Sequence, residues 1–247
     1  MTRKKFLLSA VCLLLAIATV IGTVVWALLQ SPDFYEVAIR EQADPVVRKK
    51  AAKRFVQRTL RLVDEIKTAD HWSEEFTEQQ INAWLAEELH QKFAEWVPPG
   101  VSDPRVKLTK QSIHLGFRYK DAKWNGVVSL RLKPWVTEPN QLAIQVESIR
   151  AGLVPIPLED VLQEVAKRFK KNDKDQVLIE WKQLDGKDVA IVRLAKEQPE
   201  QPVLEAVDVK KGAVRISGSR MPPGESFRFE LPRVAERIRI VNQSAAE

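Results

Sequence analysis

The segment from Phe6 to Leu29 constrains this chain more than any other part of its sequence, because it contains no charged side chain. As a helix with a rise of about 1.5 Å per residue it is roughly 36 Å long, which exceeds the hydrocarbon core of a bilayer at about 30 Å. A cleaved signal peptide is the alternative, since Ala16-Ile17-Ala18 offers small residues, but the apolar core of such a peptide usually covers only about 7 to 15 residues. The segment therefore predicts a transmembrane signal anchor, with cleavage left open.

The basic residues around this segment predict its orientation. Arg3, Lys4 and Lys5 precede it, and no comparable positive excess follows it. The positive-inside rule then places the N-terminus in the cytoplasm and the rest of a single-pass chain outside it, in the periplasm or the extracellular space. We expect a cytoplasmic tail and anchor over residues 1–30, a juxtamembrane linker over residues 31–44 and an extracytoplasmic domain over residues 45–247.

Composition excludes several classes of site. The chain of 247 residues has one Cys and three His, too few for an internal disulfide framework or a zinc cluster based on cysteine. We expect no metal and no cofactor. The net charge of +6 includes the three basic residues of the N-terminal tail, so the remaining domain is only mildly basic and nucleic acid is not an expected partner.

A basic helix is predicted directly after the linker. Asp44 suits an N-cap and Pro45 the first helical position, and apolar residues follow at helical spacing to about residue 67. Its basic side chains either contact anionic lipid headgroups or form a solvated face. The residues proposed for the membrane surface are Arg48, Lys49, Lys53, Arg54 and Arg58.

A second helix has the clearest local signature in the chain. Thr77 and Gln80 have the spacing of a capping box, and Phe76 and Ile81 that of a hydrophobic staple. An apolar stripe follows as far as Pro98-Pro99-Gly100 and predicts packing against a sheet, or a groove for a hydrophobic ligand. The residues of this stripe are Ile81, Trp84, Leu85, Leu89, Phe93 and Trp96.

The period of apolar residues then changes from 3.6 to 2, which is typical of strands with one buried face. Strands are predicted at residues 113–119, 128–132, 142–146, 177–181, 189–194, 203–209, 214–217 and 227–231. Asn125-Gly126 and Glu138-Pro139-Asn140 supply turns between the first three, which predicts adjacent antiparallel pairing, and residues 158–169 have the spacing of a third helix. The expected fold class is α+β, with an N-terminal transmembrane helix followed by a curved antiparallel sheet packed against long helices.

The sequence carries no motif that makes an enzyme claim specific. It has no nucleophile elbow, phosphate-binding glycine loop, dinucleotide fingerprint or His-Glu-x-x-His sequence. The carboxylate pairs, such as Glu87-Glu88, are neighbours whose side chains point to different faces of a helix. We therefore expect no enzymatic activity.

The order of elements and two phrases resemble a known family. Residues 76–85 read FTEQQINAWL, and residues 152–158 read GLVPIPL before a helical pattern. Together they are similar to the YpmS-like family of single-span bacterial envelope proteins and, more distantly, to the TULIP lipid-binding folds. The resemblance implies an apolar groove for a lipid-like molecule, lined by Trp84, Leu85, Phe93, Trp96, Phe117 and Trp135.

Two functions are thus expected as alternatives. In the first, the domain outside the cytoplasm binds or shuttles a lipid-like hydrophobic ligand. In the second, a membrane-tethered structural or protein-interaction domain has a filled core and contacts other envelope proteins without a ligand. An open apolar cleft distinguishes the first from the second.

Overall fold

The computed structural model describes residues 3–94, 97–122, 124–157, 178–184, 187–194 and 202–220. The helices are α1 (Arg3–Leu29), α2 (Asp33–Glu41), α3 (Pro45–Thr68), α4 (Glu78–Glu87) and α5 (Leu89–Lys92). The strands are β1 (His71–Thr77), β2 (Val101–Thr109), β3 (Ser112–Lys120), β4 (Asn125–Glu138), β5 (Gln141–Ala151), β6 (Val154–Pro155), β7 (Leu178–Leu184), β8 (Lys187–Arg193), β9 (Pro202–Lys210) and β10 (Ala213–Arg220).

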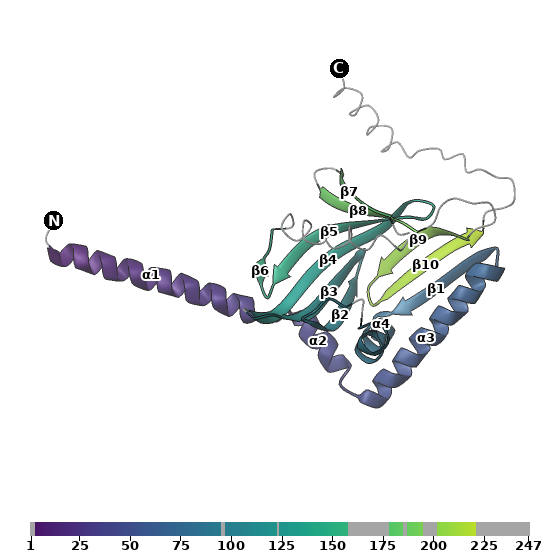
Figure 1. The fold of residues 1–247 in the computed structure, drawn as a ribbon, viewed down its shortest axis with the longest axis horizontal. Helices are drawn as coiled ribbons and strands as arrows, with labels where there is room; N and C mark the ends of the chain where they lie inside the picture. The colour runs from purple at the N-terminus through teal and green to yellow at the C-terminus, as the bar shows by residue number, and fades with distance from the viewer. Residues whose placement is uncertain are drawn as a thin grey trace, which may run out of the picture.

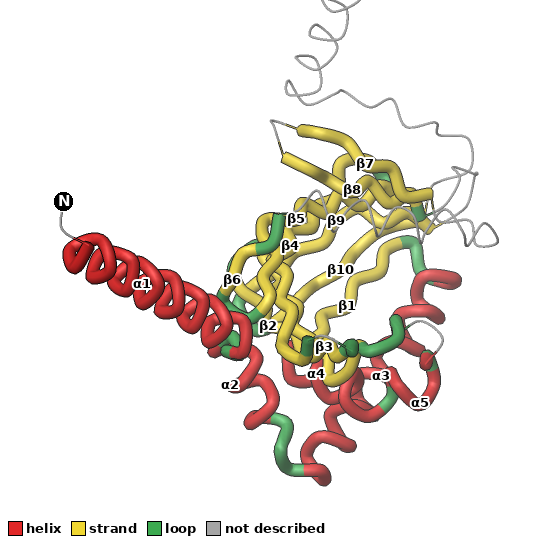
Figure 2. The backbone as a smooth tube through the Cα atoms, turned by 60° about the vertical axis from the view of Figure 1, so that its left-hand side comes forward, coloured by secondary structure: helices red, strands yellow, loops and turns green. Residues whose placement is uncertain are grey.

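The chain is an α+β protein with an N-terminal apolar helix and two antiparallel sheets, as the fold class predicts in its main outline. The large sheet has the order β2-β3-β4-β5-β8-β7, with β6 beside β5, and the small sheet has the order β1-β10-β9. Helices α2 to α5 lie along one side of the strands, while α1 projects away from them (Figures 1 and 2). One sheet was expected from the sequence, whereas the described strands form two.

Helix α1 is long and apolar enough to cross a bilayer, by length and composition. The large apolar side chains from Leu13 to Trp26, and that of Leu29, are exposed. A signal sequence would have the same properties, so this finding is coarser than the predicted anchor and orientation.

Residues 31–44, expected as a linker, contain helix α2. Its side chains Tyr35 and Ala38 are 0% and 1% exposed, so this helix is docked against the fold. The two helix starts predicted after it are confirmed. Asp44 accepts hydrogen bonds from the backbone N–H groups of Val46 and Val47, and Thr77 and Gln80 form the predicted capping box.

The second helix differs from its prediction in length. A single helix was expected from Thr77 to Trp96, whereas α4 ends at Glu87 and a short α5 follows. The first apolar positions of the stripe pack as expected, with Ile81 against a cluster that contains Leu62, Trp72 and Phe76. This cluster joins α3, β1 and α4, and strands β9 and β10 also contribute to it.

The adjacent antiparallel pairing of β3, β4 and β5 is confirmed, but one turn is misplaced in the sequence interpretation. Asn125-Gly126 begins β4, and the turn lies before it, where the Trp124 backbone N–H donates to Asp121 Oδ1 at 2.7 Å. Gly126 is needed for packing and not for a turn, because a Cβ there would lie 2.3 Å from the Trp124 ring. Sequence analysis also missed β1 and β2, whose residues do not alternate clearly between apolar and polar.

Three expectations fall outside the described residues and are left as predictions. They are the helix at residues 158–169, the strand at residues 227–231 and the position of Trp96 on the apolar stripe.

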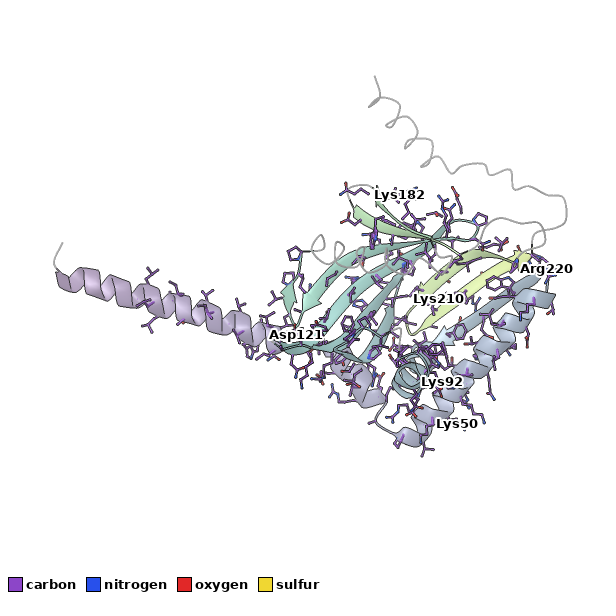
Figure 3. All side chains as sticks on the ribbon, in the orientation of Figure 1. Lys50, Lys92, Asp121, Lys182, Lys210 and Arg220 are labelled. Atoms are coloured by element: carbon purple, nitrogen blue, oxygen red, sulfur yellow. The ribbon has the colours of Figure 1, made fainter. Side chains whose placement is uncertain are left out.

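The two ends of the large sheet meet different parts of the molecule. At one end, the β4 strand and the short β6 strand contact the end of α1. At the other end, the tips of two hairpins meet β9, where the Gln111 N–H donates to Val209 O at 2.9 Å and the Asn140 N–H donates to Leu204 O at 3.1 Å. Figure 3 shows Asp121 at the end nearest α1, and Lys210 and Arg220 on the small sheet away from it. We call these the anchor end and the β9 end of the sheet.

Candidate functional site

A pocket of about 210 Å³ lies at the anchor end of the large sheet. Its wall is built from the α1–α2 junction, strands β3, β4 and β5, and the turn after β5. The lining residues are Pro32, Phe34, His114, Ser129, Leu130, Arg131, Ser148, Arg150, Gly152 and Leu153. This volume is below the roughly 300 to 1,000 Å³ of pockets that enclose a drug-sized ligand, so it suits a small polar group rather than a whole acyl chain.

Strand register places the polar lining residues on one face of the sheet. His114 pairs with Arg131, which pairs with Ser148, and in the next row Ser129 pairs with Arg150. Directly paired residues of neighbouring antiparallel strands project to the same face, and every second residue along a strand does so too. Three strands therefore contribute two guanidinium groups, two hydroxyl groups and one imidazole to the same small surface.

A β-bulge adds one carboxylate beside this surface. The register of β4 and β5 shifts between Arg131 and Leu132, so that β5 has one extra residue there. From this point Glu147 accepts a charged hydrogen bond from Arg131 Nε at 2.9 Å and a hydrogen bond from Ser112 Oγ at 3.3 Å. Arg150 is exposed, and no ion pair joins it to another residue of the described part of the chain.

His114 is held neutral by its surroundings. Burial lowers the pKa of its imidazole from the ordinary value of 6.5, and the nearby positive charge of Arg131 lowers it further, against a smaller opposite effect of Glu147. At neutral pH the ring therefore has one N–H donor and one acceptor nitrogen. The ring of Phe34 lies beside it, with 5.5 Å between the ring centroids.

Helix α2 is fixed over this face by its aromatic residues. The Tyr35 hydroxyl donates to the Asp103 carbonyl at 2.9 Å, at an irregular point of β2 where Asp103 has φ of 49°. Gly116 makes room for both rings, since a Cβ there would lie 2.8 Å from the Tyr35 ring and 3.1 Å from the Phe34 ring. Burial, and then the Asp103 carboxylate, raise the pKa of Tyr35 above its usual value, so its hydroxyl stays protonated and able to donate.

The end of α1 is fixed on the opposite side of the pocket. The Leu153 N–H donates to the Ala27 carbonyl at 2.9 Å, and the Gly152 N–H donates to the Val127 carbonyl at 2.7 Å. Gly152 has φ of 58°, and a Cβ there would lie 2.4 Å from the Ala27 carbonyl oxygen. Only glycine combines this backbone conformation with such a close approach. The pocket therefore has a defined position relative to the apolar helix.

A second polar region lies at the side of β2, against helix α4. The Asn82 amide accepts from Val106 N at 2.7 Å and donates to Val106 O at 2.8 Å, and the Glu78 carboxylate accepts from Leu108 N at 2.7 Å. Glu78 also binds Lys107, with 2.8 Å between Oε1 and Nζ, which raises the pKa of that lysine. Glu78 and Asn82 thus pair backbone groups along β2. Their role in this part of the chain is structural.

The burial of α4 is the opposite of what its apolar stripe predicts. Glu78, Gln80 and Asn82 are 7%, 8% and 1% exposed, whereas the stripe residues Trp84 and Leu85 are only half-buried. The polar face of the helix is thus the more deeply buried one. The i, i+4 spacing of Glu78 and Asn82 was the available signal.

Of the six residues predicted to line an apolar groove, the five that the structure describes are not gathered around one space. Trp84 and Phe93 lie together, with ring centroids 5.7 Å apart, and Trp84 also lies 5.4 Å from Phe55 of α3; Leu85 is half-buried on the same helix as Trp84. Trp135 packs elsewhere, against a cluster of Ala143, Val189 and Ile191. Phe117 pairs with Val128, and Trp135 lies seven positions after Val128 along β4, so alternation puts these two rings on opposite faces of the sheet. Trp96 lies outside the described residues.

The five basic residues proposed for the membrane surface lie on α3, which runs away from α1 on the other side of the fold (Figure 1). Two of them bind acidic partners within the domain, since Arg48 pairs with Glu87 and Arg58 with Glu74. Lys49, Lys53 and Arg54 are exposed. Their contact with lipid stays a prediction.

The pocket residues themselves were missed from the sequence. Arg131, Ser129, Ser148 and Arg150 alternate with apolar residues along their strands, and such positions are normally solvated. Only the docking of α2 and of the end of α1 turns that polar face into a pocket.

Among the residues that the structure describes, no three His, Cys, Asp or Glu side chains are grouped so as to hold a metal ion. The arrangement at the anchor end offers donors for an anionic or polar group instead. Comparison of the chain with protein-family models, with characterised proteins and with solved structures finds no match.

Proposed function

We propose that this chain is a membrane-anchored domain, outside the cytoplasm, that binds a lipid-like ligand where its large sheet meets the anchor. The observation that carries the proposal is the position of the pocket, because its lining residue Leu153 is hydrogen-bonded to Ala27 at the end of α1. The cluster of Arg3, Lys4 and Lys5 before the apolar segment supports the orientation. The proposal keeps the expected architecture, a curved sheet packed against long helices.

An amphipathic ligand fits this position better than a purely apolar one. The pocket is too small for an acyl chain, and its wall is polar on the sheet side. The neighbouring surface of α1 is apolar and exposed, with Val24 and Val25 being 45% and 49% exposed. A ligand with a polar head and an apolar chain satisfies both surfaces when the head lies in the pocket and the chain stays in the bilayer beside α1.

A structural or protein-interaction role is the second candidate, and the aromatic cluster of α4 favours it. The Trp84 ring lies between those of Phe55 and Phe93, as in a filled core. In that role the half-buried stripe is packing, and the envelope partners expected from the sequence contact some other surface.

Lipid retention distinguishes the two candidates. The full chain is purified in mild detergent, and native mass spectrometry detects bound lipid. Ser148→Phe fills the pocket with an aromatic ring and removes the retained lipid, whereas Ser73→Phe, the same change on the exposed face of β1, leaves it bound.

The variant Trp84→Glu completes this experiment. It leaves lipid retention unchanged when the pocket at the anchor end is the site. Loss of lipid in Trp84→Glu but not in Ser148→Phe would move the site to the apolar stripe. A wild-type chain that retains no lipid would favour the structural role.

The proposed orientation has a separate test. Protease added to intact cells or, for a periplasmic domain, to spheroplasts degrades the domain and leaves a fragment that contains the anchor. Full protection of the domain contradicts its placement outside the cytoplasm.

A further inference from the structure

The pocket at the anchor end has an unbalanced charge. Arg131 and Arg150 both line it, and Glu147 is the carboxylate that pairs with Arg131. The charged groups that act on the neighbouring His114 are the same Arg131 and Glu147, so the neutral imidazole adds no positive charge. Two guanidinium groups against one carboxylate leave the pocket with one positive charge in excess.

The donors in the pocket suit a tetrahedral oxyanion. Guanidinium groups bind phosphate through two parallel N–H groups, in a geometry that an ammonium group cannot reproduce. The pairing of Ser129 with Arg150 and of Ser148 with Arg131 sets a hydroxyl beside each guanidinium. A volume of about 210 Å³ accommodates a phosphate group with a short polar substituent.

The position of the pocket indicates where such an anion comes from. Gly152 and Leu153 join the pocket wall to the last turn of α1 through the bond to Ala27. If α1 spans the bilayer, its end lies at the depth of the lipid headgroups, where phosphate groups are concentrated. An anionic phospholipid then presents its phosphate to the pocket without leaving the membrane.

We propose that Arg150 and Arg131, with Ser129 and Ser148, bind the phosphate group of an anionic lipid at the end of the anchor. This inference rests on the proposed lipid-binding function and adds the chemistry of the headgroup. It assigns Arg150 the largest part, because its charge is not already matched by a carboxylate in the described part of the chain.

The test uses the full chain in detergent with equimolar phosphatidylglycerol and diacylglycerol, which lacks the phosphate group. Native mass spectrometry measures the ratio of the two bound lipids. The wild-type chain retains phosphatidylglycerol about tenfold more than diacylglycerol, because one charged hydrogen-bonded pair has roughly that effect on affinity. Arg150→Ala removes the preference, and Arg150→Lys restores part of it.

A matched control is Arg193→Ala, which changes an exposed arginine of the same sheet that pairs with Glu180 and does not line the pocket. This variant keeps the wild-type ratio. Circular dichroism confirms that all three variants are folded, as expected for exposed positions.

Excess inorganic phosphate distinguishes the two sources of the anion. Phosphatidylglycerol that remains bound in its presence identifies a lipid headgroup as the ligand. Displacement of the lipid, together with a higher melting temperature of the wild type than of Arg150→Ala in phosphate, identifies a site for free phosphate with the same chemistry.

Different results would overturn the phosphate site and the proposed lipid-binding function. Equal retention of both lipids by the wild type, or a preference that persists in Arg150→Ala, overturns the phosphate site while lipid binding stands. A chain that retains neither lipid overturns the proposed function. If it also shows no stabilisation by phosphate that depends on Arg150, the phosphate site is overturned as well.

Discussion

The β9 end and the anchor end of the large sheet both carry polar groups, but they use them differently. Near the β9 end, the Gly212 N–H donates to Leu108 O and the Glu78 N–H donates to Gly212 O, while Asn82 pairs both backbone groups of Val106 along β2. At the anchor end, polar side chains surround a pocket, and its lining residue Arg150 has no ion pair with the described residues.

This difference between the two ends indicates which polar residues stabilise the fold and which are available to a ligand. A buried polar group that lacks a partner costs more free energy than a satisfied one gains, so the contacts of Asn82 and Glu78 act on stability. Polar groups around an open pocket keep their hydration, and changing them has little effect on folding. Variants at the two ends should therefore separate stability from binding.

The largest expected effect is that of Asn82→Ala on stability. The substitution leaves the N–H and C=O groups of Val106 without partners in a buried environment, where each costs about 1 to 3 kcal/mol. We expect the free energy of unfolding to fall by roughly 2 to 5 kcal/mol. Urea unfolding of the detergent-solubilised chain, followed by tryptophan fluorescence, measures it.

The control for this prediction is Asn125→Ala, which removes an exposed asparagine at the start of β4. Its effect should lie within about 0.5 kcal/mol. If both substitutions had the same effect, the pairing of Asn82 with Val106 would not stabilise the fold.

The second effect compares two glycines, one at each end. Gly152 and Gly212 have φ of 58° and 79°, so alanine at either position costs about 1 kcal/mol through the backbone alone. At Gly212 a Cβ meets nothing within 4 Å, whereas at Gly152 it meets the carbonyl oxygens of Ala27 and Leu28. Gly152→Ala should therefore cost about 1 to 3 kcal/mol more than Gly212→Ala.

Limited proteolysis checks where this strain acts. In Gly152→Ala, cleavage between α1 and α2 should become faster, because the end of the anchor no longer fits against the turn after β5. Equal cleavage of both variants would mean that α1 is not docked on this turn.

The two ends also show which features of the fold and of the pocket could be predicted from the sequence. The capping box at Thr77 and the N-cap at Asp44 were predictable because each depends on a few neighbouring residues. The hydrogen bonds of Asn82 depend on Val106 of β2, which is 24 positions further along the chain. The residues of β2 do not alternate clearly between apolar and polar. The pocket was less predictable still, because it needs three strands, a bulge and the docking of two helices.

The third prediction concerns acid stability and the ion pairs between α3 and β1. Burial by itself raises the pKa of Glu74, but hydrogen bonds from Arg61 and the Glu75 backbone and the charge of Arg58 outweigh it, so the pKa is lowered from 4.5. A carboxyl group with a lowered pKa stabilises the fold fully above its unfolded value and loses this contribution as the pH falls through the folded value.

Stability should therefore decline below about pH 4.5, and Glu74→Gln should remove this part of the decline. The effect should be about 1 kcal/mol, because both arginines are partly exposed to solvent. Melting temperatures at several acidic pH values measure it. A wild type and a Glu74→Gln variant with parallel pH profiles would contradict the prediction.

The smallest expected effect is at the anchor end, where His114 responds to a ligand rather than to folding. Its pKa is lowered by burial and by Arg131, so the empty pocket holds a neutral imidazole at neutral pH. An anion bound beside it stabilises the protonated ring and raises that pKa, and by linkage protonation must then strengthen the binding of the anion. Retention of phosphatidylglycerol should therefore increase by about threefold as the pH falls below 6.5, and His114→Asn should make retention independent of pH over this range. Retention by the wild type that does not change with pH would mean that the anion lies too far from the imidazole, on the side of the pocket formed by Arg150.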